Sequence, residues 1–381
     1  MRNTAPEFGP NWFTSVMGTG IVAVAITGLP FDPPGGRVAA VAFWLAVVFW
    51  LVGVVLLAAI CTVMIRRRHD GASTPLRHLD DPVLAHFYGA PPMALLTVGA
   101  STMAVGPAII GPDATAIVGA VCWIPGTALG LIAAVAIPYR VITAHTVTDD
   151  AASGGWLVSI VPPMVSAATG AALVKHLPAG QFQETMLLAC YGLFGLTAVA
   201  GFLVLNQLWQ RIIRHGLPAA GAVPTLWIGL GFLGQSITAV HHLGVVAPDV
   251  AGDYGHALTM FALCYGVPVW GFTMFWLALV SALTLRQFRD GLPFAPTWWS
   301  FTFPVGTVVT GTGALADATG LAMFAVVAGI LLAGLLCGWA AAVVASVALF
   351  RESAEFRESA EPETRNTADE SLPVSTCTWD C

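Results

Sequence analysis

The chain has 381 residues, of which 57% are hydrophobic and only 9% are charged, whereas a soluble domain carries about 25% charged residues. This composition excludes a soluble globular protein and a nucleic-acid-binding protein, and it predicts an all-α, polytopic protein of the lipid bilayer. The formal net charge of −6 comes mostly from residues 351–381, which hold eight acids and three arginines. The charge therefore says little about the molecule on which the protein acts.

Ten apolar segments, each long enough to cross a bilayer as a helix, follow one another along the chain. They cover about residues 11–29, 38–65, 82–105, 113–138, 156–176, 184–209, 223–245, 254–285, 298–316 and 320–350. The loops between them are too short for a second folded domain.

The domain organisation follows from these segments. We expect a cytoplasmic N-terminus at 1–10, a ten-helix transmembrane domain at 11–350, and an acidic cytoplasmic tail at 351–381. The tail is expected to extend the last helix for a turn or two and to be disordered beyond it.

The basic residues predict the orientation. Thirteen of the fifteen Lys and Arg residues lie at the N-terminus, in the tail, or in loops that follow even-numbered segments. Only Arg37 and Lys175 lie on the opposite side. By the positive-inside rule, both termini of this multi-pass protein are expected in the cytoplasm, and the protein in the cell membrane.

The odd-numbered segments share a second feature, since each combines Gly or Pro with hydroxyl or amide side chains. Broken helices are tolerated in lipid where they line a cavity. We therefore expect five helical hairpins, with odd helices lining a central pore and even helices forming an outer ring. The pore-lining candidates are Gly18, Thr19, Gly20, Pro91, Pro92, Pro162, Ser166, Thr169, Gln235, Ser236, Pro304 and Thr307. The alternative interpretation is that Gly and Pro merely allow close packing of membrane helices.

The stretch from Trp298 to Gly306 opens the ninth segment and is the most informative part of the chain. Trp298 and Trp299 suit the headgroup layer. Phe303 follows one residue ahead of Pro304, which is expected to bend the helix. We expect the Phe303 ring to face a polar interior rather than lipid. The alternative is a phenylalanine packed between helices.

The predicted pore carries no fixed charge, because no Asp or Glu lies near the middle of a segment and all basic residues lie in loops or at segment ends. Exposed N–H groups of broken helices and hydroxyls such as those of Thr19, Ser166 and Thr307 would then offer hydrogen bonds to an oxyanion. The alternative for each hydroxyl is a bond to a carbonyl of its own helix.

Histidines are the groups near the segments that titrate close to neutral pH. His86 lies at the cytoplasmic side of the third segment, and His241 and His242 lie at the external end of the seventh. We take these three as candidate pH sensors. Adjacent residues point to different faces of a helix, so His241 and His242 are not expected to share a metal.

The sequence contains no motif of a metalloprotease, a phosphate-binding loop or a serine hydrolase, and no pair of carboxylates inside a segment. The seven cysteines make no metal-ligand pattern, and the pair Cys377 and Cys381 in the tail has no assigned role. We expect no enzyme activity and neither a cofactor nor a metal.

Three stretches resemble the tellurite-resistance/dicarboxylate transporter family, which includes the TehA channel, the plant slow-type anion channels, the yeast malate permease and the fungal sulfite efflux pumps. They are Asn11–Val22 (NWFTSVMGTGIV), His78–Leu84 (HLDDPVL) and Trp298–Gly306 (WWSFTFPVG). Segment number and orientation agree over about residues 10–345. The proline pair Pro91-Pro92 departs from the pattern of some branches of the family.

The resemblance implies a ten-helix, quasi-five-fold pore in each protomer of a homotrimer, embedded in the lipid bilayer. It implies that Phe303 is the residue that occludes the pore. It also implies transport of small anions, and we expect a C4-dicarboxylate or other organic acid such as malate, moved with or without a coupled proton. The alternatives are a passive gated channel for chloride, nitrate or sulfite, and an intramembrane metalloenzyme.

Overall fold

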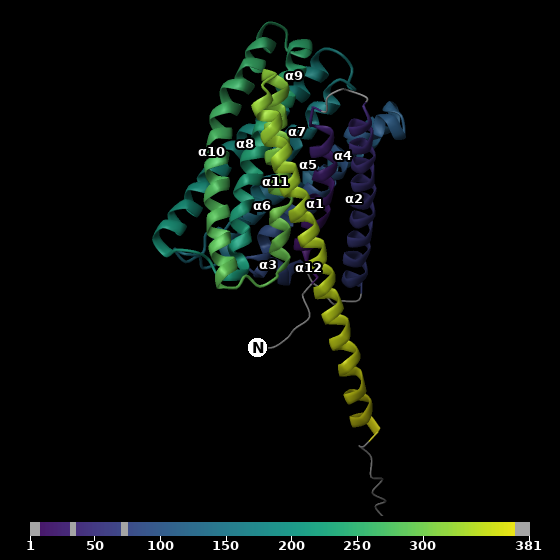
Figure 1. Ribbon diagram of the computed structural model, residues 1–381, viewed down its shortest axis with the longest axis vertical. Coiled ribbons are helices and arrows are strands. Elements are labelled where there is room, and N and C mark those ends of the chain that lie inside the picture. Colours follow the sequence, from purple (N-terminus) through teal and green to yellow (C-terminus); the bar gives the residue numbers. More distant parts are fainter. Residues whose placement is uncertain (1–7, 31–35, 70–74, 370–381) are drawn as a thin grey trace, which may run out of the picture. The chain divides into compact units, whose positions relative to one another are not determined.

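The computed structural model describes residues 8–30, 36–69 and 75–369, and all regular structure in these residues is helical (Figure 1). Residues 8–339 form one compact unit, and residues 340–369 belong to another, which is described by itself. The prediction of an all-helical fold is confirmed for the described residues.

Two classes of long helix alternate along the chain. The helices of the first class are α1 (Phe13–Thr27), α4 (Ala90–Ile109), α7 (Pro162–Val174), α9 (Ile228–Val250) and α11 (Phe303–Thr319). The helices of the second class are α2 (Arg37–His69), α5 (Pro112–Ala144), α8 (Gln181–His215), α10 (Gly255–Asp290) and α12 (Ala322–Asp369). Short helical segments complete the fold: η1 (Pro10–Trp12), α3 (Pro75–Asp80), η2 (Leu84–Gly89), α6 (Gly155–Ile160), η3 (Ala220–Trp227), η4 (Gly252–Tyr254) and η5 (Pro296–Phe301).

Within the described residues, seven helical segments are long and apolar enough to cross a membrane. They are Arg37–His69, Leu84–Ile109, Pro112–Ala144, Gln181–His215, Ala220–Val250, Gly252–Asp290 and Ala322–Arg351. The helices α1, α7 and α11 have only 15, 13 and 17 residues. One residue, Val161 or Thr302, separates α7 and α11 from the short helical segment before each, whereas η1 leads directly into α1. The arrangement of ten spanning helices as five hairpins therefore stays a prediction.

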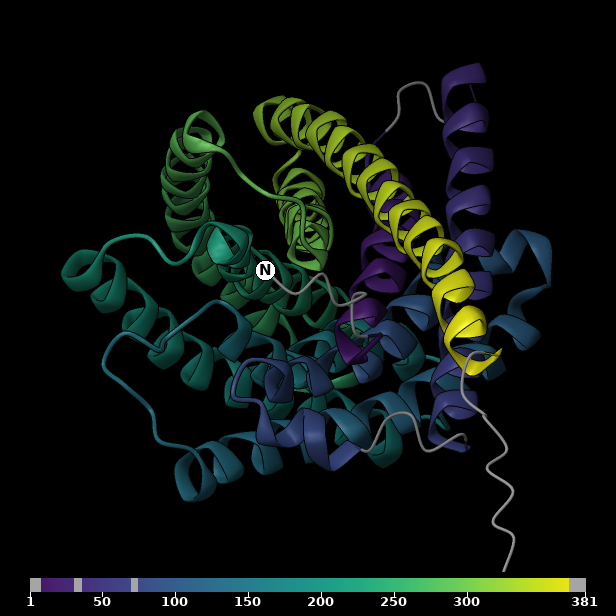
Figure 2. The ribbon, with the colours of Figure 1, turned by 90° about the horizontal axis from the view of Figure 1, so that it is seen from below.

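The first class of helices forms a closed ring. In chain order α1 packs on α4, α4 on α7, α7 on α9 and α9 on α11, and α11 packs back on α1. The helices α2, α5, α8 and α10 each pack on the ring helix that precedes them. Figure 2 shows purple α1 and light-green α11 toward the middle of this unit, with α2 and α10 outside them. We call the two classes inner and outer helices.

Burial separates the two classes. The most apolar stretch of η3 and α9 is 89% buried, whereas the corresponding stretches of the outer helices are 17–28% buried. Exposed Val, Leu, Ile and Phe side chains cover the outer helices. Such an apolar exterior is favourable in contact with lipid and would be unfavourable in contact with water.

Glycines let the inner helices approach one another closely. A Cβ atom on Gly234 of α9 would lie 2.5 Å from the backbone carbonyl carbon of Thr307 in α11. A Cβ atom on Gly20 would lie 2.9 Å from the Thr97 side chain of α4, and one on Gly18 would lie 2.1 Å from the Thr302 hydroxyl oxygen. The odd-numbered segments were expected to be broken helices, but α1 is continuous, and Gly18 and Gly20 serve close packing in it.

The prolines also act differently from the expectation. Pro91, Pro92, Pro162 and Pro304 lie in the first turns of α4, α7 and α11. The missing N–H of proline has no helical partner at that position in any case, so proline starts a helix there at no cost. The chain therefore breaks just before these residues, and Pro304 does not bend α11 from within.

The last helix continues further than expected. α12 runs to Asp369, through much of the acidic segment, where Ala, Glu and Arg are good helix formers. Residues 370–381, with Cys377 and Cys381, lie outside the described residues.

Tryptophans of the outer helices tie the inner helices in place. Trp50 Nε1 of α2 donates to Thr102 of α4 at 2.9 Å. Trp270 Nε1 of α10 donates to Thr312 of α11 at 3.0 Å. Trp339 Nε1 of α12 donates to the Thr19 hydroxyl oxygen of α1 at 3.0 Å. The Thr19 hydroxyl is thus engaged on the side of α1 that faces α12.

Gly234→Ala tests the close packing of the ring. The added methyl group would meet the backbone of Thr307, which cannot move aside as a flexible side chain can. We expect the free energy of unfolding to fall by about 1–3 kcal/mol, measured as a lower Tm in detergent. Gly192→Ala on α8 is the control, because nothing lies within 4 Å of its Cβ position. Equal Tm values for the two variants would contradict the inferred close contact of α9 with α11.

Candidate functional site

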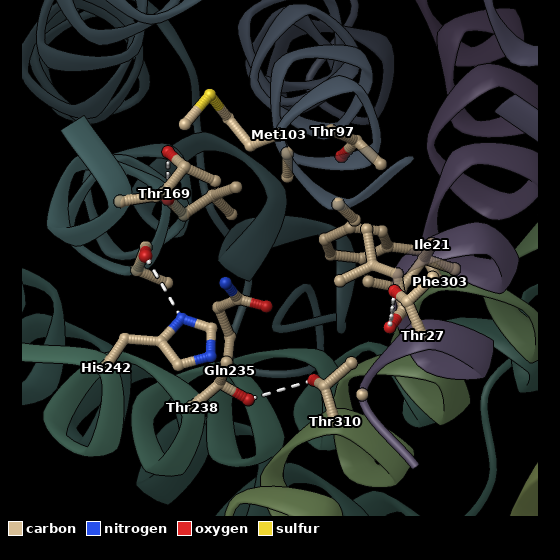
Figure 3. Close-up of a pocket in the computed structure, with 17 residues that line it drawn as sticks. Ile21, Thr27, Thr97, Met103, Thr169, Gln235, Thr238, His242, Phe303 and Thr310 are labelled. Carbon is tan, nitrogen blue, oxygen red and sulfur yellow. Dashed lines mark hydrogen bonds between the residues drawn. The ribbon is translucent and has the colours of Figure 1, made fainter. Parts of the chain in front are cut away.

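A cavity of about 310 Å³ lies inside the ring, and all five inner helices contribute to its wall (Figure 3). We call it the central cavity. Its apolar wall includes Ile21 of α1, Met103 of α4 and Val165 of α7. Its polar residues include Thr169, Gln235, Thr238, His242 and Thr310.

Two further cavities adjoin the same helices. A vestibule of about 800 Å³ shares Val24, Thr27 and His242 with the central cavity and is also lined by Lys175 and Asp317. A small cavity of about 40 Å³ lies among Met17, Phe87, Val158, Phe232 and Trp299. The central cavity therefore has a wide space on one side and a narrow, apolar one on the other.

Phe303 separates the central cavity from the small one. Of the described residues, it alone lines both. It is the first residue of α11 and follows Thr302, whose φ of −104° and ψ of −78° mark the break between η5 and α11. The side chain is 5% exposed. The break thus places an aromatic ring between the two cavities, and Figure 3 shows Phe303 at the edge of the central cavity.

Most hydroxyls at the central cavity are already bonded to their own helices. Thr169 donates to Val165 O at 2.9 Å, and Thr310 donates to Thr307 O at 3.0 Å. Thr238 and Thr310 also pair with each other across α9 and α11 at 2.9 Å. A hydroxyl whose proton is engaged in this way presents its oxygen to the cavity as an acceptor, so these groups are poor donors to an anion.

Gln235 is the remaining side-chain donor of the cavity, and His242 becomes a second one when its ring is protonated. The Gln235 amide lies beside His242 in Figure 3, and residues 235, 238 and 242 share one face of α9, as their spacing requires. His242 Nδ1 donates to Ala168 O of α7 at 3.3 Å. Since Nδ1 then carries the proton of the neutral ring, Nε2 is an acceptor in neutral His242 and becomes a donor only in the protonated ring.

Among the described residues, no Asp, Glu, Lys or Arg lines the central cavity. The charged groups nearest to it line the vestibule, where each forms an ion pair or hydrogen bond with another polar side chain. Lys175 forms an ion pair with Asp249 at 3.0 Å, and His241 Nε2 lies 3.2 Å from Asp317 Oδ2. The cavity itself is neutral unless His242 is protonated.

The structure brings together some of the sequence candidates. Thr169, Gln235, His242 and Phe303 line the central cavity, and Pro304 lines the small one. His241 lines the vestibule.

The other hydroxyl candidates make contacts between or within helices. Ser166 donates to Pro162 O and accepts from Thr127, Ser236 donates to Leu233 O, and Thr307 donates to Pro304 O. These bonds agree with the alternative interpretation that each hydroxyl serves its own helix.

His86 lies apart from these cavities. Its ring is 4% exposed, stacks on Trp156 at 5.8 Å, and places Nδ1 3.1 Å from Ser159 Oγ. It joins η2 to α6, the short segments that precede α4 and α7. Sequence reasoning missed Thr27, Thr97, Thr238 and Thr310 as lining residues; for Thr238, its position three residues after Gln235 is the available signal.

The geometry agrees with comparisons to known proteins. Residues 7–347 match the family described as the voltage-dependent anion channel family, SLAC1. The chain belongs to this family. It is 28% identical over 320 residues to the sulfite efflux pump SSU1 of Trichophyton rubrum, covering 80% of this chain and 81% of that protein.

Other relatives agree with this membership. An uncharacterized transporter of Methanocaldococcus jannaschii is 28% identical over 313 residues, covering 80% of this chain and 83% of that protein. The sulfite efflux pump SSU1 of Candida albicans is 24% identical over 329 residues, covering 81% of this chain and 66% of that protein. The resemblance seen in the sequence is confirmed. The chain is an integral membrane transporter or channel for anions, and not an enzyme.

Proposed function

We propose that this SLAC1-family protein moves a small monovalent anion along the axis of its inner-helix ring, with Phe303 as the gate. One observation carries the proposal: Phe303 alone among the described residues borders both the central and the small cavity. The closed ring of inner helices supports an arrangement of ten helices as five hairpins, in which odd helices line the pore and even helices face lipid.

The orientation belongs to the same proposal. The inner helices begin on the cytoplasmic side of the cell membrane, as the distribution of basic residues suggests. Residues 1–10 precede the transport domain 11–350, and the acidic residues 351–381 follow it in the cytoplasm. The homotrimer implied by the family resemblance stays a prediction.

Helix ends supply the preference for anions. Each inner helix is followed by an outer helix of at least 33 residues, long enough to return the chain to the side from which it came. All five inner helices would then start at one end of the ring. Their N-termini carry partial positive charge and unpaired N–H groups, which favour anions at that end of the path.

The neutral wall of the central cavity favours a small anion of single charge. A C4-dicarboxylate such as malate carries two charges and would find no fixed cation there, so its desolvation would be costly. The relatives from Trichophyton rubrum and Candida albicans are named sulfite efflux pumps. We therefore take sulfite, in its singly charged form, as the first substrate to test, in place of malate.

Flux in proteoliposomes tests the proposal, with membrane potential and pH gradient set separately. We expect sulfite and chloride to move and malate to move much more slowly. A flux that follows voltage alone identifies a channel, and a flux driven by the pH gradient identifies a proton-linked carrier. Malate flux as fast as sulfite flux would contradict the substrate assignment. Failure of all three anions to cross would contradict the transport path.

A further inference from the structure

A second cavity with polar walls lies outside the proposed transport path. It has a volume of about 440 Å³ and lies between the C-terminal end of α8 and the loop that leads into α6. Its walls include Gln207, Gln210, Arg211, Arg214, His215 and Trp156. We call it the basic pocket. Its volume falls within the range of about 300–1,000 Å³ that is usual for small-molecule sites.

Arg211 is held in place at this pocket. Its Nε donates to Asp150 O at 3.1 Å, and its Nη1 donates to Gly216 O at 2.6 Å. Both partners are backbone carbonyls, so they fix the guanidinium without neutralising it. The Nη2 group makes no hydrogen bond to the described residues, and a guanidinium oriented in this way suits the oxygens of a phosphate.

The charges that line the pocket are mixed in sign, with Arg211 and Arg214 positive and Asp149 negative. Arg214 and His215 are exposed at the end of α8, and Asp149 is the acid that lines the pocket. The Asp150 side chain accepts a hydrogen bond from Thr148 at 2.6 Å. That hydrogen bond and one from the Asp150 backbone N–H lower the pKa of Asp150. The electrostatic attraction of His215 and Arg211 lowers the pKa further. An anionic ligand would have to compete with these carboxylates, which makes Asp149 a useful test position.

The wall of the basic pocket leads to the gate. Trp156 lines the pocket and belongs to α6, and the same ring stacks on His86. Val158, two residues further along α6, lines the small cavity next to Phe303. α6 is also tightly packed, because a Cβ atom on Gly89 would lie 1.9 Å from Val158 O and one on Gly154 would lie 1.8 Å from Thr225 O. A shift of α6 would therefore reach η2 and η3, the segments that precede α4 and α9.

We propose that the basic pocket is a regulatory site for a phosphate-bearing anion, and that its occupant alters flux by acting on α6. This regulatory site goes beyond the proposed function. Only the placement of the site on the cytoplasmic side rests on the orientation given there. Phosphate could come from a soluble molecule or from the headgroup of an anionic lipid in the cytoplasmic leaflet.

Binding is measured on the full chain in nanodiscs. Calorimetry follows the binding of inorganic phosphate in phosphatidylcholine nanodiscs, and native mass spectrometry counts the molecules retained from nanodiscs that also contain phosphatidic acid. Binding of inorganic phosphate identifies a soluble ligand, and retention of phosphatidic acid alone identifies a headgroup.

Three variants isolate the pocket. Arg214→Gln is expected to weaken binding about ten-fold through the loss of one charged hydrogen-bond donor, and we expect the variant to fold because the side chain is exposed. Asp149→Asn is expected to tighten binding. Arg286→Gln is the matched control, since this arginine lies near the end of outer helix α10 and does not line the pocket.

Flux completes the test. Inorganic phosphate or phosphatidic acid is expected to change chloride flux in wild-type proteoliposomes several-fold, and to have much less effect on Arg214→Gln. Loss of binding that is equal in Arg214→Gln and Arg286→Gln, or no binding of either probe, would overturn the site. Binding without any change in flux would overturn its regulatory role. Neither result affects the basal flux on which the proposed function depends.

Discussion

Replacing Phe303 with alanine is expected to raise anion flux at least about ten-fold, which corresponds to a barrier lower by about 1.4 kcal/mol. The ring is the one described side chain that borders both the central and the small cavity. Its removal joins the two spaces, and it removes an apolar constriction of the kind that stops ions by excluding water. Chloride and sulfite fluxes in proteoliposomes measure the effect.

Folding must be separated from gating in this experiment, because deletion of a buried phenylalanine ring costs about 3–5 kcal/mol of stability. Phe303→Leu keeps part of the volume, so its flux is expected to fall between those of the wild type and Phe303→Ala. Phe301→Ala is the matched control: this neighbouring ring packs edge-on against Trp227 at 5.1 Å and lines neither cavity. A folded Phe303→Ala protein with wild-type flux would contradict the gate.

The positions of the helices could be predicted from the sequence because the apolar runs are long and bounded by charges. The segment predicted at 184–209 lies within α8, and the basic residues after it extend that helix to His215. The different character of odd and even segments also predicted which helices are buried, since small and hydroxyl residues pack against protein and Val, Leu and Phe face lipid.

The side chains of the cavity could be predicted only in part, because the rotation of each helix decides them. Thr169 and Ser166 lie three residues apart on α7, but only Thr169 lines the central cavity, while Ser166 accepts a hydrogen bond from Thr127 of α5. Sequence reasoning also named Gly18 as a pore-lining residue. Its role depends on the Thr302 side chain packed against it, which lies 284 residues further along the chain and is not visible in the local pattern.

The three histidine candidates illustrate the same limit. All three lie near segment ends in the sequence, but their surroundings differ. His86 is buried between Trp156 and Ser159, and His241 lies beside Asp317. His242 lines both the central cavity and the vestibule. Only His242 is placed to meet an anion inside the ring, so only its protonation would change the charge of the central cavity.

His242→Gln is therefore expected to flatten the pH dependence of flux. In the wild type, chloride flux should rise as the pH on the vestibule side falls, because protonation turns Nε2 into a charged N–H donor while Nδ1 stays bonded to Ala168 O. A hydrogen bond from a charged donor is stronger than a neutral one by about 1 kcal/mol, so an increase of about five-fold is expected. Chloride is the substrate of choice because it does not itself titrate in this range, as sulfite does.

His241→Gln is the matched control for this prediction, since His241 is the adjacent residue and lines only the vestibule. The His241→Gln variant should keep the rise in flux at low pH, because His241 pairs with Asp317 outside the central cavity and its protonation does not change the charge inside it. If His242→Gln retains the wild-type pH profile and His241→Gln loses it, the titrating group lies in the vestibule. The central cavity would then bind its anion through Gln235 and the helix ends alone, and proton linkage would arise before the anion reaches Phe303.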